Sequence, residues 1–204
     1  MNTILDVINN RRSINNYDPS KSLTKEQIIT LMTLTTKAPS AFNLQNWEFV
    51  AVQSKDAKVK LKALAYGQQK IEESSATFIV CGTLHPQGLL AHSLAPSLEK
   101  GIISSGIVDG WVNAASNMYT NNSIFQRDEA IRSASLAGMT LMLAAEGMGL
   151  SSCPIIGFDP EGVKKAFGLS DNSVPTMLIT VGYAIEDNWA QKLRRPLDEV
   201  LTIL

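Results

Sequence analysis

The chain is organised around one stretch, Ala38-Pro39-Ser40-Ala41-Phe42-Asn43-Leu44-Gln45-Asn46-Trp47. It joins a strong helix pattern to a strong strand pattern. Two side-chain amides, Asn43 and Gln45, stand two positions apart with an aromatic residue on each side. We interpret the stretch as a wall of a ligand site whose amides face the polar edge of a flat heterocycle. The alternative is a rigid connector whose amides satisfy local backbone groups.

The residues on either side of this stretch give clear local signals. Thr24 is a candidate N-cap, and Gln27 stands three residues later, as in a capping box that opens a helix over 23–37. Pro39 ends this helix because the residue before a proline is driven out of the α region. The aromatic and β-branched residues of 47–53 predict a strand.

The rest of the chain mixes helices with a few separated strands, without regular alternation of the two. A continuous apolar run at 76–81 predicts a strand buried on both faces. The other expected strands are 151–158 and 174–183, and the expected helices are 3–10 (with Ile4, Leu5 and Ile8 inward), 57–65, 109–118, 123–148 and 159–168. The segment 82–122 is the least regular. An excursion of this length typically covers a site.

Composition limits the function classes. A chain of 204 residues fits a single domain over 1–204. Charged residues make up only 18 %, so we expect a second subunit to cover part of the surface. The net charge is −1, which gives no electrostatic case for binding nucleic acid or an anionic membrane. The two cysteines, Cys81 and Cys153, lie in apolar surroundings and are interpreted as small core residues.

The sequence contains no signal for a membrane. The first residues include no basic region followed by an apolar run, so no signal peptide is expected. No window holds the roughly 18 uninterrupted apolar residues that a membrane span requires. The expectation is a cytoplasmic protein without a membrane partner.

Familiar catalytic motifs are missing, and separate polar clusters stand in their place. We find no dinucleotide-binding glycine fingerprint, no P-loop and no zinc-protease motif, and the two histidines, His85 and His92, support no metal site. Arg11-Arg12-Ser13 and Lys192-x-Arg194 offer cations and a hydroxyl for a phosphate, although arginines at a helix end also complement its dipole. Such clusters suit a cofactor that carries its own chemistry, with no catalytic side chain.

Four pieces of the sequence, in this order, resemble the flavin-dependent nitroreductase family. They are Arg11-Arg12-Ser13-Ile14 with Tyr17; Ala38-Pro39-Ser40 with Asn43-x-Gln45-x-Trp47; Gly149 with Pro154-Ile155-Ile156-Gly157-Phe158-Asp159; and Lys192-x-Arg194-Arg195-Pro196-Leu197. The resemblance covers nearly the whole chain and is weakest over 82–122.

The resemblance implies an α+β fold with a central, mostly antiparallel sheet flanked by helices, in an intertwined homodimer. It also implies FMN at the subunit interface and a ping-pong cycle. In that cycle NADH or NADPH reduces the flavin, and a flat acceptor (a nitroaromatic compound, a quinone or an enone) then reoxidises it. An acceptor pocket shaped by 82–122 would place Trp111 and Tyr119 near the ring.

The resemblance also implies roles for individual residues. Arg11, Ser13, Lys192 and Arg194 correspond to phosphate ligands, with Arg12 contributing mostly backbone. Pro39, Ser40 and Asn43 correspond to the part that reaches the flavin of the other subunit, and Gln45 to an amide on the ring. Pro154 and Ile155 lead to Ile156 and Gly157, which correspond to backbone donors near flavin N5.

Two positions depart from the family pattern. Asn46 stands where a proline often precedes the tryptophan. Asn15 stands where a lysine or arginine often approaches the flavin, so charge on the reduced ring needs another source, for which Lys70 and Gln68 are candidates. Two rival functions remain open: a flavin-binding module that stores or senses flavin without turnover, and a flavin-free interaction protein.

Overall fold

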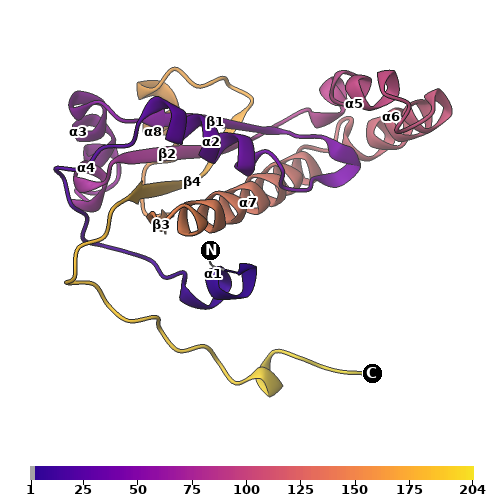
Figure 1. The fold of residues 1–204 in the computed structure, drawn as a ribbon. Helices are drawn as coiled ribbons and strands as arrows, with labels where there is room; N and C mark the ends of the chain where they lie inside the picture. Colours follow the sequence, from indigo (N-terminus) through magenta and orange to yellow (C-terminus); the bar gives the residue numbers. More distant parts are fainter. Residues whose placement is uncertain (1–2) are drawn as a thin grey trace.

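The fold is built on a four-stranded antiparallel sheet with helices on both faces (Figure 1). The structure, a computed structural model, describes residues 3–204; the first two residues of the expected domain lie outside the described residues. The strands are β1 (Trp47–Val52), β2 (Ala76–Thr83), β3 (Ser151–Ile155) and β4 (Ser173–Gly182). They lie in the order β1-β2-β4-β3, and every neighbouring pair is antiparallel. The predicted α+β class is confirmed.

Most of the helices lie where the sequence predicts them, and the structure contains others that were not predicted. They are α1 (Ile4–Asn10), α2 (Lys25–Thr35), α3 (Lys55–Leu64), α4 (Lys70–Glu73), α5 (Leu90–Glu99), α6 (Ser105–Tyr119), α7 (Ser123–Gly147) and α8 (Pro160–Ala166), with short 3-10 turns η1 (Ala41–Asn43), η2 (Pro86–Leu89) and η3 (Leu197–Glu199). The capping box of Thr24 and Gln27 forms as predicted. The irregular segment 82–122 contains two helices, α5 and α6.

Strand β2 is the centre of the core, with alternate side chains serving opposite faces of the sheet. Phe78 and Val80 pack with α7 and α2, whereas Ile79 and Cys81 pack with α3 and α8. This arrangement explains the continuous apolar run and confirms that the strand is buried on both faces. The result is a three-layer arrangement with β3 as an edge strand.

Helix α7 lies so close to the sheet that small residues are required at the contact. A Cβ built on Gly82 would come within 2.0 Å of the backbone oxygen of Ala130, a distance that no side chain can occupy. Alanines at 130, 134 and 137 keep the corresponding face of α7 narrow. The long, small-residue helix predicted from the sequence therefore runs directly against the central strands.

The predicted orientation of α1 is wrong for the single chain. Ile4, Leu5 and Ile8 are exposed, and Val7 is the buried residue of this helix. Helix α1 rests beside α7 (Figure 1), and its exposed apolar side chains face away from the rest of the chain. The sequence correctly predicted a helix here. Within the single chain, however, no surface covers its apolar side chains.

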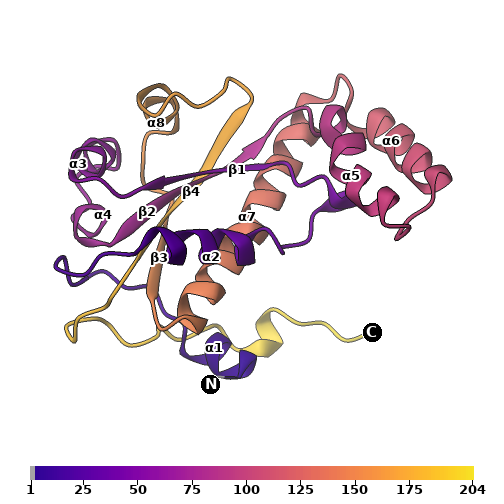
Figure 2. The same cartoon turned by 45° about the horizontal axis from the view of Figure 1, so that its top comes forward.

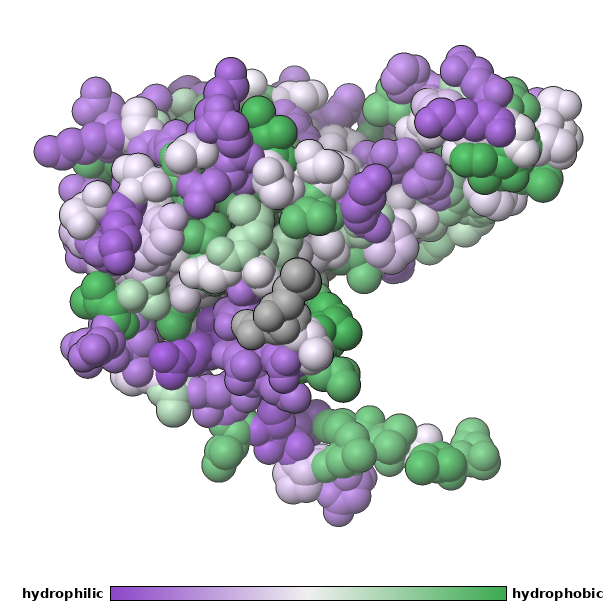
Figure 3. Space-filling model, in the orientation of Figure 1, coloured by the Kyte–Doolittle hydropathy of each residue, from purple (hydrophilic) through white to green (hydrophobic). Residues whose placement is uncertain are grey.

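Two parts of the chain extend from the sheet and its covering helices. Helices α5 and α6 form an arm at one end of α7, and the chain after β4 runs as an extended tail beyond α1 to the C-terminus (Figures 1 and 2). The space-filling view shows a hollow between arm and tail, with apolar residues along the tail (Figure 3). Within residues 3–204 we find no helix with the length and apolarity needed to cross a membrane.

Candidate functional site

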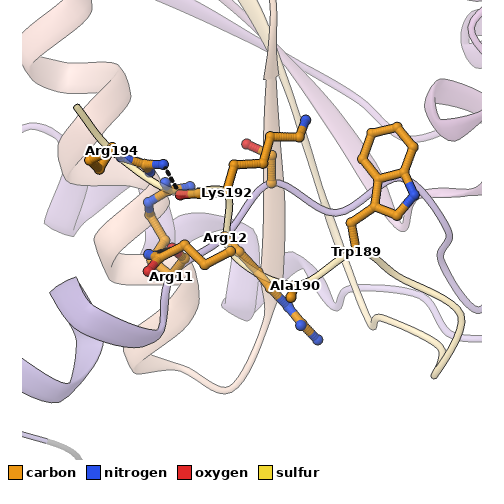
Figure 4. A pocket seen from close by; sticks show the side chains of 8 residues that line it. Arg11, Arg12, Trp189, Ala190, Lys192 and Arg194 are labelled. Atoms are coloured by element: carbon orange, nitrogen blue, oxygen red, sulfur yellow. Dashed lines mark hydrogen bonds between the residues drawn. The ribbon is translucent and has the colours of Figure 1, made fainter.

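Cations from both ends of the chain gather around one small cavity. The cavity has a volume of about 180 Å³ and is lined by Arg11, Arg12, Ser13, Trp189, Ala190, Gln191, Lys192 and Arg194. In Figure 4, Arg11 and Arg194 lie on one side of it and Trp189 on the other. The two basic clusters singled out in the sequence are thus brought together.

The chemistry of this cavity suits an anion. Three guanidinium groups and one ammonium group line it, and its lining includes no carboxylate. The Nη1 atom of Arg11 is buried and has no hydrogen-bond partner among the described residues. Because a buried, unpaired donor is costly, an anionic oxygen at this position would stabilise the protein. The positions of the two clusters favour the anion-site interpretation over a simple complement to the helix dipole.

The cavity is held against the edge of the sheet. Arg11 follows the last residue of α1, and its backbone oxygen accepts a hydrogen bond from Gln191 Nε2 at 3.0 Å. Ser13 forms a bridge with Ser152 at the start of β3, and the N–H of Ile14 donates to the Ser152 oxygen at 3.1 Å. The first and last segments of the chain are thereby fixed beside the edge strand.

Asn15 follows the segment that runs beside β3, and its side chain accepts a hydrogen bond from a lysine. Lys70 Nζ donates to Asn15 Oδ1 at 3.0 Å and lies 3.5 Å from Cys153 Sγ. The backbone N–H of Asn15 donates to Asn188 Oδ1 at 2.9 Å, and this contact holds the backbone at Asn15 against the segment that contains Asn188. Lys70 therefore brings a positive charge to the side chain of Asn15.

The turn after β3 carries the residues expected near flavin N5. Ile156 is 83 % exposed, and Gly157 follows it at the surface. Gln68 Nε2 donates to the Gly157 oxygen at 2.7 Å. Gln68, predicted as a candidate cofactor ligand, is thus engaged with the protein backbone.

The 38–47 stretch lies at a different place. It packs on the arm, where Leu44 is buried with Leu90 and Leu94, and the rings of Phe42 and Trp111 meet edge-on at 6.1 Å. None of its residues lines the cation cavity. Both views place η1 beside α5 and α1 beside the opposite end of α7 (Figures 1 and 2). A helix of 25 residues spans about 37 Å, so the two groups of predicted site residues are far apart within one chain.

The stretch adopts a strained backbone that directs its amides outward. Phe42, Asn43 and Gln45 all have positive φ, at 52°, 60° and 51°. Ser40 holds this geometry, because its hydroxyl accepts a hydrogen bond from the Gln45 N–H at 2.9 Å. Left-handed backbone at bulky residues persists where the surroundings enforce it, and it is common at ligand sites.

The side chains of Asn43 and Gln45 are exposed, and neither makes a hydrogen bond within residues 3–204. The connector interpretation requires these amides to hydrogen-bond to local backbone groups. They do not, so the structure does not support that interpretation. Pro39 and Ser40 flank them at the end of α2. Both amides are therefore available to a ligand.

Asn46 is a structural residue. It is buried, its Nδ2 donates to the Thr83 oxygen at 3.3 Å, and its backbone oxygen accepts from the Thr83 N–H at 2.9 Å. It thus extends the pairing of β1 with β2 by one residue. Compared with proline, asparagine adds the Nδ2 donor, while its buried Oδ1 has no hydrogen-bond partner among the described residues.

The expectation that Tyr119 approaches the ligand is wrong. Tyr119 is fully buried, and its hydroxyl donates to Glu129 Oε2 at 3.3 Å. Burial, with the negative charge of Glu129, raises the pKa of Tyr119 to about 12. Arg132 and Ser133 bind the same carboxylate. This cluster fastens α6 to α7, while Trp111 stays partly exposed on the arm.

Several residues of the cavity region were missed by the sequence reasoning. Trp189 lies under Lys192, whose Nζ is 4.6 Å from the ring centroid, and Gln191 ties the tail to Arg11. Their only sequence signal is proximity to Lys192. Among the described residues no group of histidine, cysteine, aspartate or glutamate is arranged to hold a metal ion.

Comparison with known proteins agrees with this geometry. The sequence model described as the Nitroreductase family matches residues 8–183. YodC of Bacillus subtilis, named as a candidate NAD(P)H nitroreductase, is 38 % identical over 204 residues, covering 100 % of both chains. A CLA biosynthesis enone reductase of Lactiplantibacillus plantarum is 27 % identical over 91 % of this chain and 88 % of its own.

A solved structure extends the comparison to the fold. A candidate nitroreductase from Exiguobacterium sibiricum, solved in complex with FMN, superposes with a TM-score of 0.93. It is 30 % identical, and the match covers 100 % of this chain and 98 % of that chain.

Proposed function

Because this chain belongs to the nitroreductase family, we propose that it is an FMN-dependent oxidoreductase that uses NADH or NADPH as reductant. The observation that carries the proposal is the buried, unpaired Nη1 of Arg11 in a cavity lined by cations. A relative solved with FMN supports the identity of the ligand. The phosphate of FMN carries negative charge and acceptor oxygens, which complement the cations that line this cavity.

The residues that would hold FMN follow the edge of the sheet. Arg11, Ser13, Lys192 and Arg194 would bind the phosphate, with Arg12 beside them. Asn15 and Lys70 lie next along the edge, followed by Pro154 and Ile155 in β3 and by the Ile156–Gly157 turn. The outer edge of β3 is occupied at Ser152 by the Ser13–Ile14 segment, so the part of the edge available to a ligand would lie beyond it, toward Ile155.

FMN, when bound, would supply the redox chemistry, with NADH or NADPH as the hydride donor and a second substrate as the two-electron acceptor in a ping-pong cycle. The protein contributes binding, orientation and electrostatics. Lys70 brings positive charge to the site, and such charge favours a reduced ring that carries negative charge. No side chain is required as a catalytic acid or nucleophile.

The functional unit in this proposal is an intertwined homodimer. Asn43 and Gln45 lie at the opposite end of α7 from the cation cavity, so one chain does not bring the two halves of the site together. A second copy of the chain would supply the missing half. The exposed apolar face of α1 and the apolar tail residues Leu197, Val200, Leu201, Ile203 and Leu204 support such an interface, because obligate interfaces are large and apolar.

The proposed acceptor is a flat, electron-poor compound: a nitroaromatic compound, a quinone or an enone. Relatives named for nitroreductase and enone reductase activity support these classes. Trp111, on the arm formed by α5 and α6, packs edge-on against Phe42 of η1, and these aromatic rings suit the edge of a planar substrate. We propose that residues 82–122 cover the site of the partner subunit.

The visible absorption spectrum tests the proposal. Protein loaded with FMN is expected to be yellow and to lose its colour when NADH or NADPH is added without oxygen. Bound FMN that neither nucleotide reduces would favour a storage or sensing module. Protein that takes up no FMN would contradict both functions.

A further inference from the structure

Gln68 connects two elements that meet beside the proposed flavin site. Its Nε2 group donates to the Gly157 oxygen at 2.7 Å and to the Ala65 oxygen at 3.1 Å. Ala65 ends α3, and Gly157 lies in the turn after β3. Both donor hydrogens of the amide are therefore used by backbone carbonyl groups.

The turn at Gly157 has few other constraints. The Ile156 side chain is 83 % exposed and does not anchor it. The remaining backbone contacts are Phe158 N–H to the Ile156 oxygen at 3.1 Å and Asp159 N–H to the Leu64 oxygen at 2.8 Å. Glycine has the widest backbone freedom, so the peptide groups on either side of Gly157 depend on these contacts for their orientation.

The N–H of Gly157 is free to serve a ligand. It makes no hydrogen bond within residues 3–204. A Cβ at this position would be 3.5 Å from Gln68 Nε2 and 4.0 Å from Tyr66, so the glycine and the amide are in close contact. The carbonyl of Gly157 thus faces Gln68, while its N–H has no partner in the described part of the chain.

We propose that Gln68 is a positioning residue for hydride transfer. By binding the Gly157 carbonyl, it restricts rotation about the glycine and, together with the Phe158 N–H bound to the Ile156 oxygen, would hold the free N–H in one orientation for flavin N5. This inference rests on the proposed function. Because both hydrogens of its amide are committed to carbonyl groups, Gln68 would act on FMN through Gly157 and not as a donor to the ring.

Two substitutions remove the donor in different ways. Gln68→Met keeps the length of the side chain without a donor or a charge. Gln68→Glu keeps the shape but places acceptor oxygens against the Gly157 carbonyl. Gln69→Glu is the matched control: it adds the same charge one residue away, where the Gln69 amide oxygen already accepts from Lys62 Nζ at 3.1 Å.

The test measures FMN labelled with ¹⁵N at N5, bound to each variant, by NMR. In both Gln68 variants we expect the N5 resonance to move toward its position in free FMN, and the single-turnover rate with NADH to fall about tenfold, since misaligned donors lose much of their effect. FMN affinity should change less than about threefold, because the phosphate cavity is untouched. Gln69→Glu should match the wild type in all three measurements.

Two results would overturn the inference and are distinguishable. If wild-type protein binds FMN and is reduced, but both Gln68 variants keep its N5 resonance and its rate, the positioning role is wrong and the proposed function stands. If wild-type protein binds no FMN, the proposed function and the positioning role both fail. A purely structural role for Gln68 would lower the melting temperature without moving the N5 resonance of the saturated protein.

Discussion

Lys70 Nζ lies 3.0 Å from Asn15 Oδ1, and this pair brings a positive charge to a position where the sequence has an amide. Lys70 is half-buried and forms no ion pair with a carboxylate among the described residues. Its charge is therefore available to a neighbouring anion. The pair joins α4 to the segment after α1, two elements that are 55 residues apart in sequence.

Removing this charge should make the flavin harder to reduce. For Lys70→Met we expect a midpoint potential more negative by about 30 mV, which corresponds to about 1.4 kcal/mol for a two-electron couple. The reason is the loss of a cation beside a ring that gains negative charge. Potentiometric titration measures the shift. Lys25→Met, which removes an exposed lysine on α2, is the control, and an equal potential in Lys70→Met and wild type would disprove the role.

The cation cavity should determine FMN affinity. Arg11→Ala is expected to raise the Kd for FMN by about 10- to 100-fold, the range for losing a charge-assisted hydrogen bond. Arg195→Ala is the matched control, because Arg195 is exposed and does not line the cavity. Quenching of FMN fluorescence measures both constants. Equal losses in the two variants would indicate a general charge effect instead of a phosphate site.

A site shared between subunits predicts complementation. Gln45→Ala and Arg11→Ala alter opposite halves of the proposed site, and each should weaken FMN binding by roughly tenfold or more when present in both subunits. A heterodimer with one variant per chain would contain one site with both defects and one intact site. We expect half of its sites to bind FMN with wild-type affinity.

The heterodimer can be isolated by co-expressing the two variants with different tags and purifying on both. A titration in which no site has wild-type affinity would show that each chain forms its site alone.

Tyr119 should make stability depend on alkaline pH. Its pKa is raised to about 12, so the hydrogen bond to Glu129 contributes fully below pH 10 and is lost as the pH rises through about 12. Tyr119→Phe is expected to lower the free energy of unfolding by about 1–2 kcal/mol at pH 8. The difference from wild type should shrink between pH 10 and 12. Denaturant titrations at fixed FMN concentration measure it, and a difference that grows over this range would contradict the assignment.

Local sequence patterns correctly predicted the elements whose stability depends on nearby residues or on burial in the sheet. The capping box at Thr24, the two-faced strand around Phe78 and the Asp159–Pro160 helix start all formed as expected. Each depends on neighbours within a few residues or on burial in the centre of the sheet. The convergence of Arg11 with Lys192 was inferred from the shared chemistry of two separate basic clusters and supported by the family resemblance, because no local rule relates residues that far apart.

The errors arose where a side chain's partner lies elsewhere. Tyr119 was expected at the ligand, but its partner Glu129 is on the next helix and stood out only as one of many scattered carboxylates. Ile4 and Leu5 follow a helical pattern, yet the surface that would bury them is absent from the single chain. Sequence periodicity identifies an apolar face without identifying what covers it.

The most direct test of the central claim is an anaerobic titration in two stages. Protein saturated with FMN and freed of excess flavin is titrated first with NADH or NADPH and then, after removal of nucleotide, with a quinone. We predict that about one equivalent of reductant per FMN bleaches the flavin absorbance, and that about one equivalent of quinone restores it, as a ping-pong cycle requires. Flavin absorbance that neither nucleotide changes would contradict the proposed enzyme.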